Sequence, residues 1–455
     1  MEETIKRRVM LFCASVLVLA SVSVVVRFFT TQVVAKTFRI HNEVTNAIVG
    51  DDPTLRNFDG ITNRAADKGN FDWAVRYPFT EKSSQSGKAS KNTDVVRHWT
   101  GKCKSIESKI QEWTGTHFWK YMSIVSFKSV LQEKIGWNIV PLKEYNGVIT
   151  LEDGQLTGLQ AKTDVTGKIQ NVVAFSEVCH EQGIQFLMVL APNKIARSDT
   201  EYAGRLDFSN ENSDAFLEGL KEKDVEFLDL RENVKRDGLL QHELFYRTDP
   251  HWTGETGRWA AQQILLRLNQ DYGYEAETSL QNPEQYTETL YPSWFLGSQG
   301  RKLTMGRVTP DDFVLYYPKF ETSFHMVIPS LDIDTQGDFT IMYNMDQMDL
   351  SRGYYQSSAY HTYGFGDRAL ITVHNDTSKD GKKLLMIHDS FADVVTPFLA
   401  LGMEELASID LRHFTGSLQT YLQKERPDTV LLLYNAGELT APEKTDAHTG
   451  LFDFR

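Results

Sequence analysis

Cysteine is scarce in this chain, which has 3 cysteines in 455 residues. Cys13 lies in an apolar stretch near the N-terminus, and Cys103 and Cys179 can either pair or remain as free, buried thiols. A small disulfide-stabilised fold is excluded, because such folds use many more cysteines for their length. The C-x-x-C and H-E-x-x-H spacings are also absent, so the sequence supports no zinc site, and we expect neither a metal nor a cofactor.

An excess of positive charge is absent as well. The sequence has 48 Lys and Arg residues against 61 Asp and Glu residues, which gives a formal net charge of −13. Nucleic acids are bound through a basic surface, so this balance argues against DNA or RNA as the main ligand. The length fits one large α/β domain with additional segments, or two domains of ordinary size.

One long hydrophobic run is present, over residues 9–26, and it follows Lys6, Arg7 and Arg8. A membrane-spanning helix needs about 20 apolar residues, and flanking basic residues stay on the cytoplasmic side. We therefore predict a cytoplasmic tip and a single transmembrane anchor over residues 1–30, with the rest of the chain outside the cell membrane. A cleaved signal peptide is the alternative, although its apolar region is usually shorter.

The segments after the anchor differ in composition. Residues 31–100 are expected to form an extracytoplasmic linker region, because they include a polar stretch rich in Ser and Lys over residues 81–94. Residues 101–140 carry apolar side chains at helical spacing and predict a helical segment.

Residues 141–455 alternate between apolar runs and helix-like segments. The runs that predict buried strands are 184–192, 225–231, 383–390, 406–412 and 429–435, and the helix candidates are 168–182, 213–223, 254–269 and 416–424. This alternation predicts an α/β domain with a parallel sheet covered by helices on both faces. Residues from about 285 to 370 break the pattern with aromatics, Gly and Pro, and we expect a large insertion with irregular or antiparallel structure.

Reactive side chains of open α/β sheets gather at the carboxyl ends of the strands. The stretch over residues 384–400, LLMIHDSFADVVTPFLA, puts Ser390 directly after a buried strand and before a helix. A serine there has its hydroxyl at the sheet edge, and its backbone N–H points from a helix start, where a developing oxyanion is stabilised. The plainer interpretation of Ser390 is a helix N-cap.

A partner for this serine lies in residues 246–261, YRTDPHWTGETGRWAA. Asp249 and His251 precede a helix that Thr253 can cap. An aspartate two residues from a histidine can accept the ring N–H and fix the tautomer whose other nitrogen faces the serine. Most such triplets are surface or capping residues. Together with a serine at a strand end, this one predicts a Ser390–His251–Asp249 catalytic triad.

Six further residues are candidates for binding the oxyanion or the substrate. Gly297 and Ser298 can bring a backbone N–H to the oxyanion or can form only a tight turn. Asn435, at the end of the last strand, can donate to the oxyanion or can be a turn former. Lys194, Tyr246 and Arg247 can meet an anionic substrate.

The motif RTDPHWT, followed about 140 residues later by HDSFADVVTPFL, resembles the SGNH-hydrolase-like families that include the alginate O-acetyltransferases. The likeness is strongest to exported bacterial proteins named for a D-H-H-W signature, and it extends over roughly residues 140–455. It implies that Asp249 and His251 assist Ser390. Two positions depart from the pattern: Pro250 stands at its first histidine, and His388 stands where many relatives have Gly or another residue before Asp-Ser.

The resemblance also implies what this protein acts on. The expected reaction is acyl transfer to or from an acetylated exopolysaccharide or wall glycopolymer of a bacterial cell envelope. The alternatives are a carbohydrate esterase with the same triad and a non-catalytic polymer-binding or assembly protein that keeps the fold. Because cytoplasmic acetyl donors do not reach the outer face unaided, we expect a membrane-embedded partner protein that delivers the acyl group.

Overall fold

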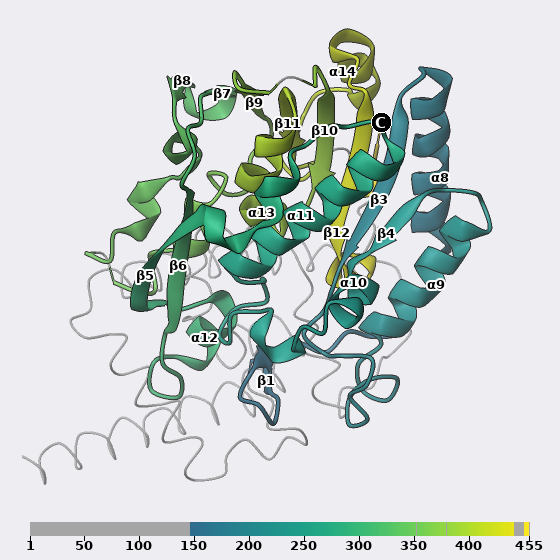
Figure 1. Ribbon diagram of the computed structural model, residues 1–455. Helices are drawn as coiled ribbons and strands as arrows, with labels where there is room; N and C mark the ends of the chain where they lie inside the picture. The colour runs from purple at the N-terminus through teal and green to yellow at the C-terminus, as the bar shows by residue number, and fades with distance from the viewer. Residues whose placement is uncertain (1–145, 352, 379, 441–449, 455) are drawn as a thin grey trace, which may run out of the picture. The chain divides into compact units, whose positions relative to one another are not determined.

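The structure is a computed structural model that describes residues 146–351, 353–378, 380–440 and 450–454 (Figure 1). These residues lie within one unit of the chain, Lys128–Arg455. The predicted anchor, the linker region and the helical segment that ends at residue 140 lie outside the described residues. Within the described ranges, no helix is both long and apolar enough to cross a membrane.

A mixed sheet of eight strands forms the centre of this region, in the order β4, β3, β12, β10, β11, β9, β7, β8. The strands from β4 to β11 in that order are parallel, and β9, β7 and β8 each pair antiparallel. The strands are β3 (Gln185–Ala191), β4 (Phe227–Asp229), β7 (Phe324–Ile328), β8 (Ile333–Gly337), β9 (Ile371–Asn375), β10 (Lys383–His388), β11 (Glu405–Ile409) and β12 (Thr429–Asn435).

Helices cover both faces of the sheet, and two short two-stranded sheets lie beside it (Figure 1). The helices are α8 (Thr166–Glu181), α9 (Ser209–Lys221), α10 (Leu230–Arg236), α11 (Gly254–Asp271), α12 (Ser298–Leu303), α13 (Ala392–Leu399) and α14 (Leu418–Glu425). The small sheets pair β1 (Ile149–Thr150) with β2 (Leu156–Thr157) and β5 (Tyr286–Phe295) with β6 (Asp311–Pro318). The 3-10 helix used below is η9 (Ala359–Thr362).

The core has two parts because successive side chains of a strand point to opposite faces. In β10, Leu384 and Met386 pack with apolar residues of α11 and α13, whereas Leu385 and Ile387 pack with those of α8, α9 and α14. Cys179 belongs to the second part as a buried free thiol, and burial raises its pKa to about 12. The continuous apolar runs therefore correspond to strands that are buried on both faces, as predicted for β3, β10, β11 and β12.

The prediction of a purely parallel sheet is wrong at one edge. The segment expected to be an insertion contributes β7 and β8 to the main sheet, next to β9, as well as the separate pair of β5 and β6. Burial alternates residue by residue along β7 and β9, as in strands with one partly open face. Continuous apolar runs cannot reveal such strands, so this edge of the sheet was missed.

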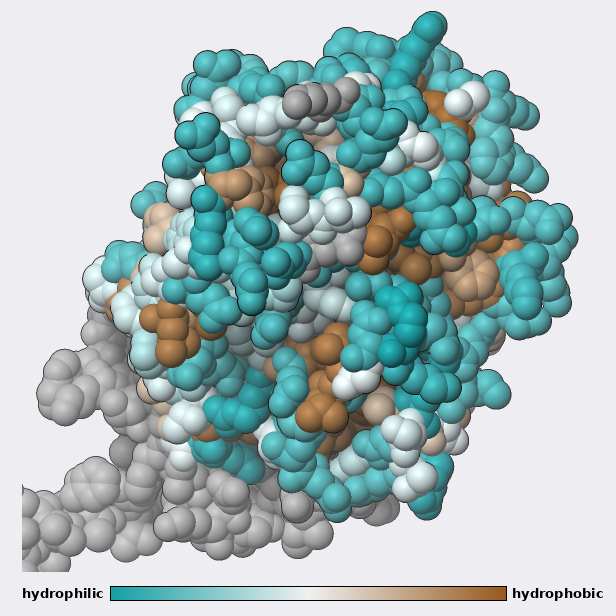
Figure 2. Space-filling model, viewed as in Figure 1, coloured by the Kyte–Doolittle hydropathy of each residue, from teal (hydrophilic) through white to brown (hydrophobic). Residues whose placement is uncertain are grey.

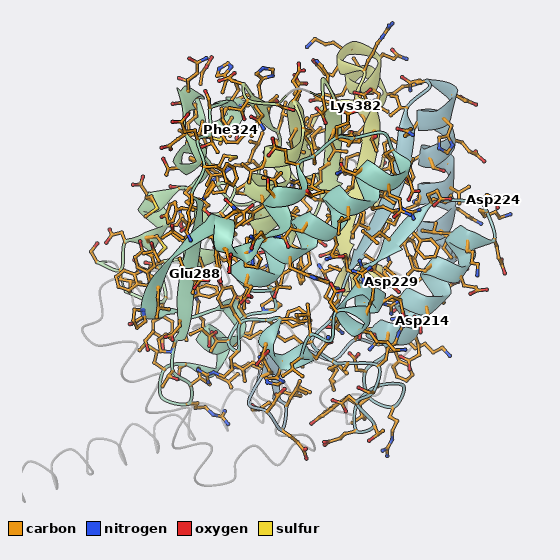
Figure 3. The ribbon with its side chains drawn as sticks, in the orientation of Figure 1. Asp214, Asp224, Asp229, Glu288, Phe324 and Lys382 are labelled. Carbon is orange, nitrogen blue, oxygen red and sulfur yellow. The ribbon has the colours of Figure 1, made fainter. Side chains whose placement is uncertain are left out.

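The carboxyl ends of the parallel strands meet at one edge. Asp229 is the last residue of β4 and Lys382 precedes the first residue of β10, and in Figure 3 they lie at opposite ends of the strands, as expected for strands that run in the same direction. The face in Figure 2 is mostly hydrophilic, with small separate hydrophobic patches. Ser390 and Asn435 both lie at the carboxyl edge, after β10 and at the end of β12, and the candidate site is built there.

Candidate active site

The acid and the histidine lie in a turn that precedes α11. Phe245 and Trp252 form an antiparallel bridge, so the chain between them folds back on itself. The Thr253 hydroxyl accepts a backbone N–H from the first turn of α11, which confirms the predicted cap. Asp249 and His251 thus lie in a short loop that is fixed by the Phe245–Trp252 bridge and by the Thr253 cap.

Ser390, His251 and Asp249 meet at the carboxyl edge of the sheet and are called here the Ser390–His251–Asp249 cluster. His251 Nε2 lies 2.7 Å from Ser390 Oγ, and His251 Nδ1 lies 2.5 Å from Asp249 Oδ1. The imidazole ring stacks on Tyr360 with a centroid distance of 4.1 Å and an interplanar angle of 17°, and Phe391 lies against it at 5.3 Å. The ring is therefore held in plane by packing and at both nitrogens by hydrogen bonds.

The protonation of the cluster follows from its partners. Burial alone raises the pKa of Asp249, but the contact with His251 and the N–H groups of Ser298 and His251 outweigh burial and hold that pKa well below its usual range. An ionised carboxylate only accepts, so His251 Nδ1 carries the hydrogen. In the neutral ring, the lone pair of Nε2 then faces the Ser390 hydroxyl. This is the tautomer that can take a proton from serine.

Asp249 is held by a second layer of polar contacts. The Ser298 N–H donates to Asp249 Oδ2 at 2.6 Å, and the Gly297 N–H donates to Thr248 Oγ1 at 2.9 Å. Thr248 in turn donates its hydroxyl and its N–H to Asp311 Oδ2 at 2.7 and 2.8 Å. The N–H groups of Gly297 and Ser298 thus already donate hydrogen bonds to the loop that carries Asp249. Of the two interpretations given for Gly297 and Ser298, the use of their N–H groups as oxyanion donors is corrected, because both N–H groups already donate to Thr248 and Asp249.

The turn that carries Ser390 is held from β12. Asp389 is fully buried, and its Oδ2 accepts the N–H and the side-chain amide of Asn435, each at 2.7 Å. Its Oδ1 accepts the Phe391 N–H at 2.9 Å. Asn435 anchors Asp389, and its Oδ1 accepts the Gly437 N–H at 2.7 Å, so it is a turn former as in the second interpretation and not an oxyanion donor. Among the described residues, the Ser390 N–H has no hydrogen-bond partner.

The residues expected to meet an anionic substrate have other partners. Lys194 is buried, with Nζ 2.7 Å from the carbonyl oxygens of Leu156 and Tyr246, and burial lowers its pKa to about 7. The Tyr246 ring is buried in the core against Phe295, Phe313 and Tyr360. Arg247 binds Thr309 and lies 3.5 Å from Asp311. Lys194 and Tyr246 support the loop from within, so their expected substrate contacts are corrected here.

Sequence reasoning missed Tyr360, Thr248 and Asp311. Tyr360 lies in η9, inside the segment expected to be an insertion, and its hydroxyl donates to the Ser390 carbonyl oxygen at 3.0 Å. Asp311 is 63 positions from Thr248. Thr248 stands in the RTDPHWT motif directly before Asp249, but nothing in the sequence pairs it with Asp311. Tyr360 has no local motif that ties it to the cluster.

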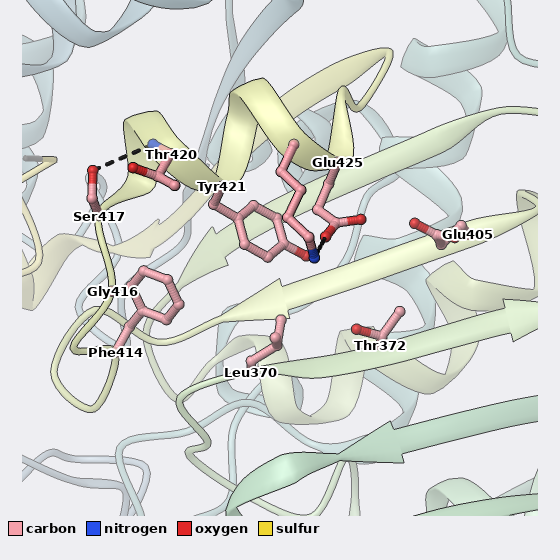
Figure 4. Close-up of a pocket in the computed structure, with 10 residues that line it drawn as sticks. Leu370, Thr372, Glu405, Phe414, Gly416, Ser417, Thr420, Tyr421 and Glu425 are labelled. Carbon is pink, nitrogen blue, oxygen red and sulfur yellow. Dashed lines mark hydrogen bonds and ion pairs between the residues drawn. The ribbon is translucent and has the colours of Figure 1, made fainter.

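Two other features of the described residues lie outside the cluster. A groove of about 470 Å³ between α14 and the strands β9 and β11 is lined by Leu370, Thr372, Glu405, Phe414, Gly416, Ser417, Thr420, Tyr421, Lys424 and Glu425 (Figure 4). Asp367, Asp410 and His413 each bring a potential metal-ligand atom within 4.8 Å of the others. The Arg412 guanidinium already pairs with Asp367 and Asp410, at 2.8 and 2.6 Å, so we assign no metal there.

Comparison with known proteins connects this geometry to a family. The family model described as an SGNH hydrolase-like domain, acetyltransferase AlgX, matches residues 152–295, and the model of the DHHW protein matches residues 234–409. The two matches overlap, and together they make residues 152–409 similar to SGNH hydrolase-like acetyltransferases and to DHHW proteins. The DHHW match includes Asp249, His251 and Ser390. No curated protein matches the chain.

Two solved structures with the same fold have low sequence identity to this chain. PatB1 of Bacillus cereus, in a structure with a sulfonyl adduct, is 20% identical with a TM-score of 0.55 and covers 68% of this chain and 98% of its own. A DHHW family protein of Eubacterium siraeum is 17% identical with a TM-score of 0.53 and covers 67% of this chain and 95% of its own. Both likenesses concern the fold of the SGNH-like domain.

Proposed function

We propose that this SGNH-like protein transfers acetyl groups to or from a cell-surface polysaccharide or wall glycopolymer, at the outer face of the cell membrane. Ser390 is the nucleophile, His251 the general base and then acid, and Asp249 the residue that orients the imidazole. The observation that carries the proposal is the pair of contacts at His251, 2.7 Å to Ser390 Oγ and 2.5 Å to Asp249 Oδ1. The match to an acetyltransferase family model supports the acyl class.

The reaction has two balanced halves. Ser390 Oγ attacks the carbonyl carbon of an acetyl donor while His251 Nε2 takes its proton, and the tetrahedral intermediate collapses when that proton passes to the leaving group. The acetyl ester on Ser390 is then attacked by a polymer hydroxyl that His251 deprotonates, and Ser390 regains its proton. If water takes the place of the polymer hydroxyl, the same residues perform ester hydrolysis.

The first experiment tests covalent chemistry at Ser390. The full-length protein is incubated with a sulfonyl fluoride and, separately, with p-nitrophenyl acetate, and its intact mass is measured. PatB1 has been solved with a sulfonyl adduct, and we expect one sulfonyl group on Ser390 here. Ser390→Ala and His251→Ala should each lose nearly all of the labelling and turnover, by several orders of magnitude.

A matched control separates chemistry from folding. Ser176 is a buried serine of α8 whose hydroxyl donates to Val173 O at 2.8 Å, and Ser176→Ala should keep wild-type labelling. Folded Ser390→Ala protein that is labelled as fast as wild type would refute the nucleophile. The choice between transferase and esterase is decided by adding oligosaccharide acceptors to the acetylated enzyme and comparing transfer with hydrolysis.

The location and the acyl donor are part of the same proposal. Residues 9–26 are proposed as an uncleaved anchor, and a membrane-embedded protein is proposed to deliver the acetyl group. Protease added to intact cells should then degrade the C-terminal region of the chain. Protection of that region until the cells are lysed would contradict the outward orientation.

A further inference from the structure

His388 ends β10, directly before Asp389 and Ser390, and makes two short contacts. Its Nδ1 lies 2.8 Å from the backbone carbonyl oxygen of Asp389, and its Nε2 lies 2.6 Å from Ser408 Oγ on the neighbouring strand β11. Both side chains are buried, with 3% and 2% of their surface exposed. The proposed reaction leaves both residues without a role.

The partners of His388 determine where its hydrogen lies. A carbonyl oxygen only accepts, so Nδ1 must carry a hydrogen and donate it to Asp389 O. In the neutral ring Nε2 then accepts from the Ser408 hydroxyl, which has no other hydrogen bond to a described residue. Ser408 thereby holds the ring from its far side, and the ring holds the carbonyl of Asp389 together with the Ala392 N–H, which donates to the same oxygen at 3.1 Å.

Fixing that carbonyl also fixes the N–H of Ser390. The Asp389–Ser390 peptide is planar and trans, so its C=O and its N–H point in opposite directions. The Ser390 N–H has no partner among the described residues. On the other side, the Tyr360 hydroxyl holds the Ser390 carbonyl at 3.0 Å. Both peptides that flank the serine are thus held by buried side chains.

We propose that the His388–Ser408 pair positions the Ser390 N–H as a donor to the oxyanion of the acyl-transfer intermediate. The inference rests on the proposed function, and His388 is a positioning residue because it acts through the peptide. Pre-aligned donors stabilise a developing negative charge without a cost of reorientation during the reaction. A residue larger than glycine before Asp-Ser therefore has a use in this chain.

The test compares three variants of the full-length protein by crystal structure and by p-nitrophenyl acetate kinetics. His388→Leu removes both contacts. His388→Asn keeps an N–H group at the position of Nδ1, and Ser408→Ala removes only the contact at Nε2. We expect His388→Leu to lower kcat by about 10- to 100-fold at unchanged KM, since loss of one oxyanion donor costs about 100- to 1000-fold. His388→Asn should recover most of that loss, and Ser408→Ala should fall between.

A matched control addresses general destabilisation. Tyr272→Phe deletes another buried hydrogen bond, from the Tyr272 hydroxyl to Phe186 O at 3.0 Å, near the amino end of β3. It should lower the melting temperature and leave kcat unchanged. If His388→Leu fails to fold, Ser408→Ala and His388→Asn carry the comparison.

The deciding readout is the direction of the Asp389–Ser390 peptide. We expect it to rotate in His388→Leu and to keep the wild-type direction in His388→Asn. The proposal is overturned if the Asp389–Ser390 peptide keeps its wild-type direction in His388→Leu. It is also overturned if Ser408→Ala changes neither the direction of that peptide nor kcat. If the wild-type protein acquires no acyl group on Ser390, the proposed function is refuted instead. The crystal structures of the variants would then still show whether His388 fixes the direction of the Asp389–Ser390 peptide.

Discussion

Gly297 packs against Asp249 with no room for a side chain, and Gly297→Ala should inactivate the protein without changing any residue of the Ser390–His251–Asp249 cluster. An added Cβ would lie 2.3 Å from Asp249 Cβ, 2.5 Å from Thr248 O and 2.7 Å from Asp249 Cα. Gly297 has φ −70° and ψ 172°, which alanine adopts freely, so backbone strain is not the cause. The conflict is purely one of space, and no flexible side-chain end can relieve it.

The size of the effect follows from these distances. Ordinary contacts of a Cβ begin at 3.4 Å, so Asp249 must move away from Gly297 by roughly 1 Å. Asp249 lies 2.5 Å from His251 Nδ1 and 2.6 Å from the Ser298 N–H, and a shift of that size breaks at least one of these bonds. Misplacement by about 1 Å can cost on the order of 100-fold in rate. Overpacking should also lower the free energy of unfolding by about 1–3 kcal/mol.

The assay is steady-state hydrolysis of p-nitrophenyl acetate together with urea denaturation. Gly158→Ala is the control, because its Cβ would meet only Gly147 O at 3.5 Å, an ordinary contact. We expect kcat to fall at least 100-fold in Gly297→Ala and to stay near wild type in Gly158→Ala. A folded Gly297→Ala protein with kcat within twofold of wild type would refute the argument that this close packing orients the acid.

Three further outcomes are expected. Asp249→Asn should lower kcat by about 10⁴-fold, less than loss of the serine or the histidine, because it mainly misorients the imidazole; ester hydrolysis measures this. Thr248→Val should lower the free energy of unfolding in urea by about 1–3 kcal/mol, because it leaves the partly buried Asp311 without a hydroxyl partner. Burial raises the pKa of Glu438 from 4.5 to about 7, so its contribution to stability in acid is lost as the pH rises through 7. Glu438→Gln should therefore raise the melting temperature at pH 8 and leave it unchanged at pH 4.

The sequence indicated Ser390, His251 and Asp249 because each part of the cluster carries a local signal. Ser390 follows a continuous apolar run, and the acid and the histidine stand two positions apart before a capped helix. Strand order then brings the two parts together, since β10 lies inside a parallel sheet whose carboxyl ends share one edge. Local pattern and general topology were sufficient to predict that these three side chains lie together.

The supporting residues could not be predicted in the same way. For Gly297 and Ser298 the sequence left open an oxyanion contact or a tight turn, and their N–H groups hold Thr248 and Asp249. A backbone N–H has no residue-specific signal, so its direction depends on tertiary packing. Lys194 shows the same limit: its position after β3 is at the right edge, but its Nζ turns inward to backbone carbonyls.

The packing of Gly297 against Asp249 also predicts how two substitutions combine. If an added Cβ acts only by displacing the acid, its effect should be small once the acid no longer orients the imidazole. Gly297→Ala in the Asp249→Asn background should then lower kcat by less than about threefold, since changes that act through one contact are not additive. Two full, multiplicative losses would mean that Gly297 reaches the reaction by another route, through Thr248 or through α12. In that case the 2.3 Å approach to Asp249 would not be the reason that this position is glycine.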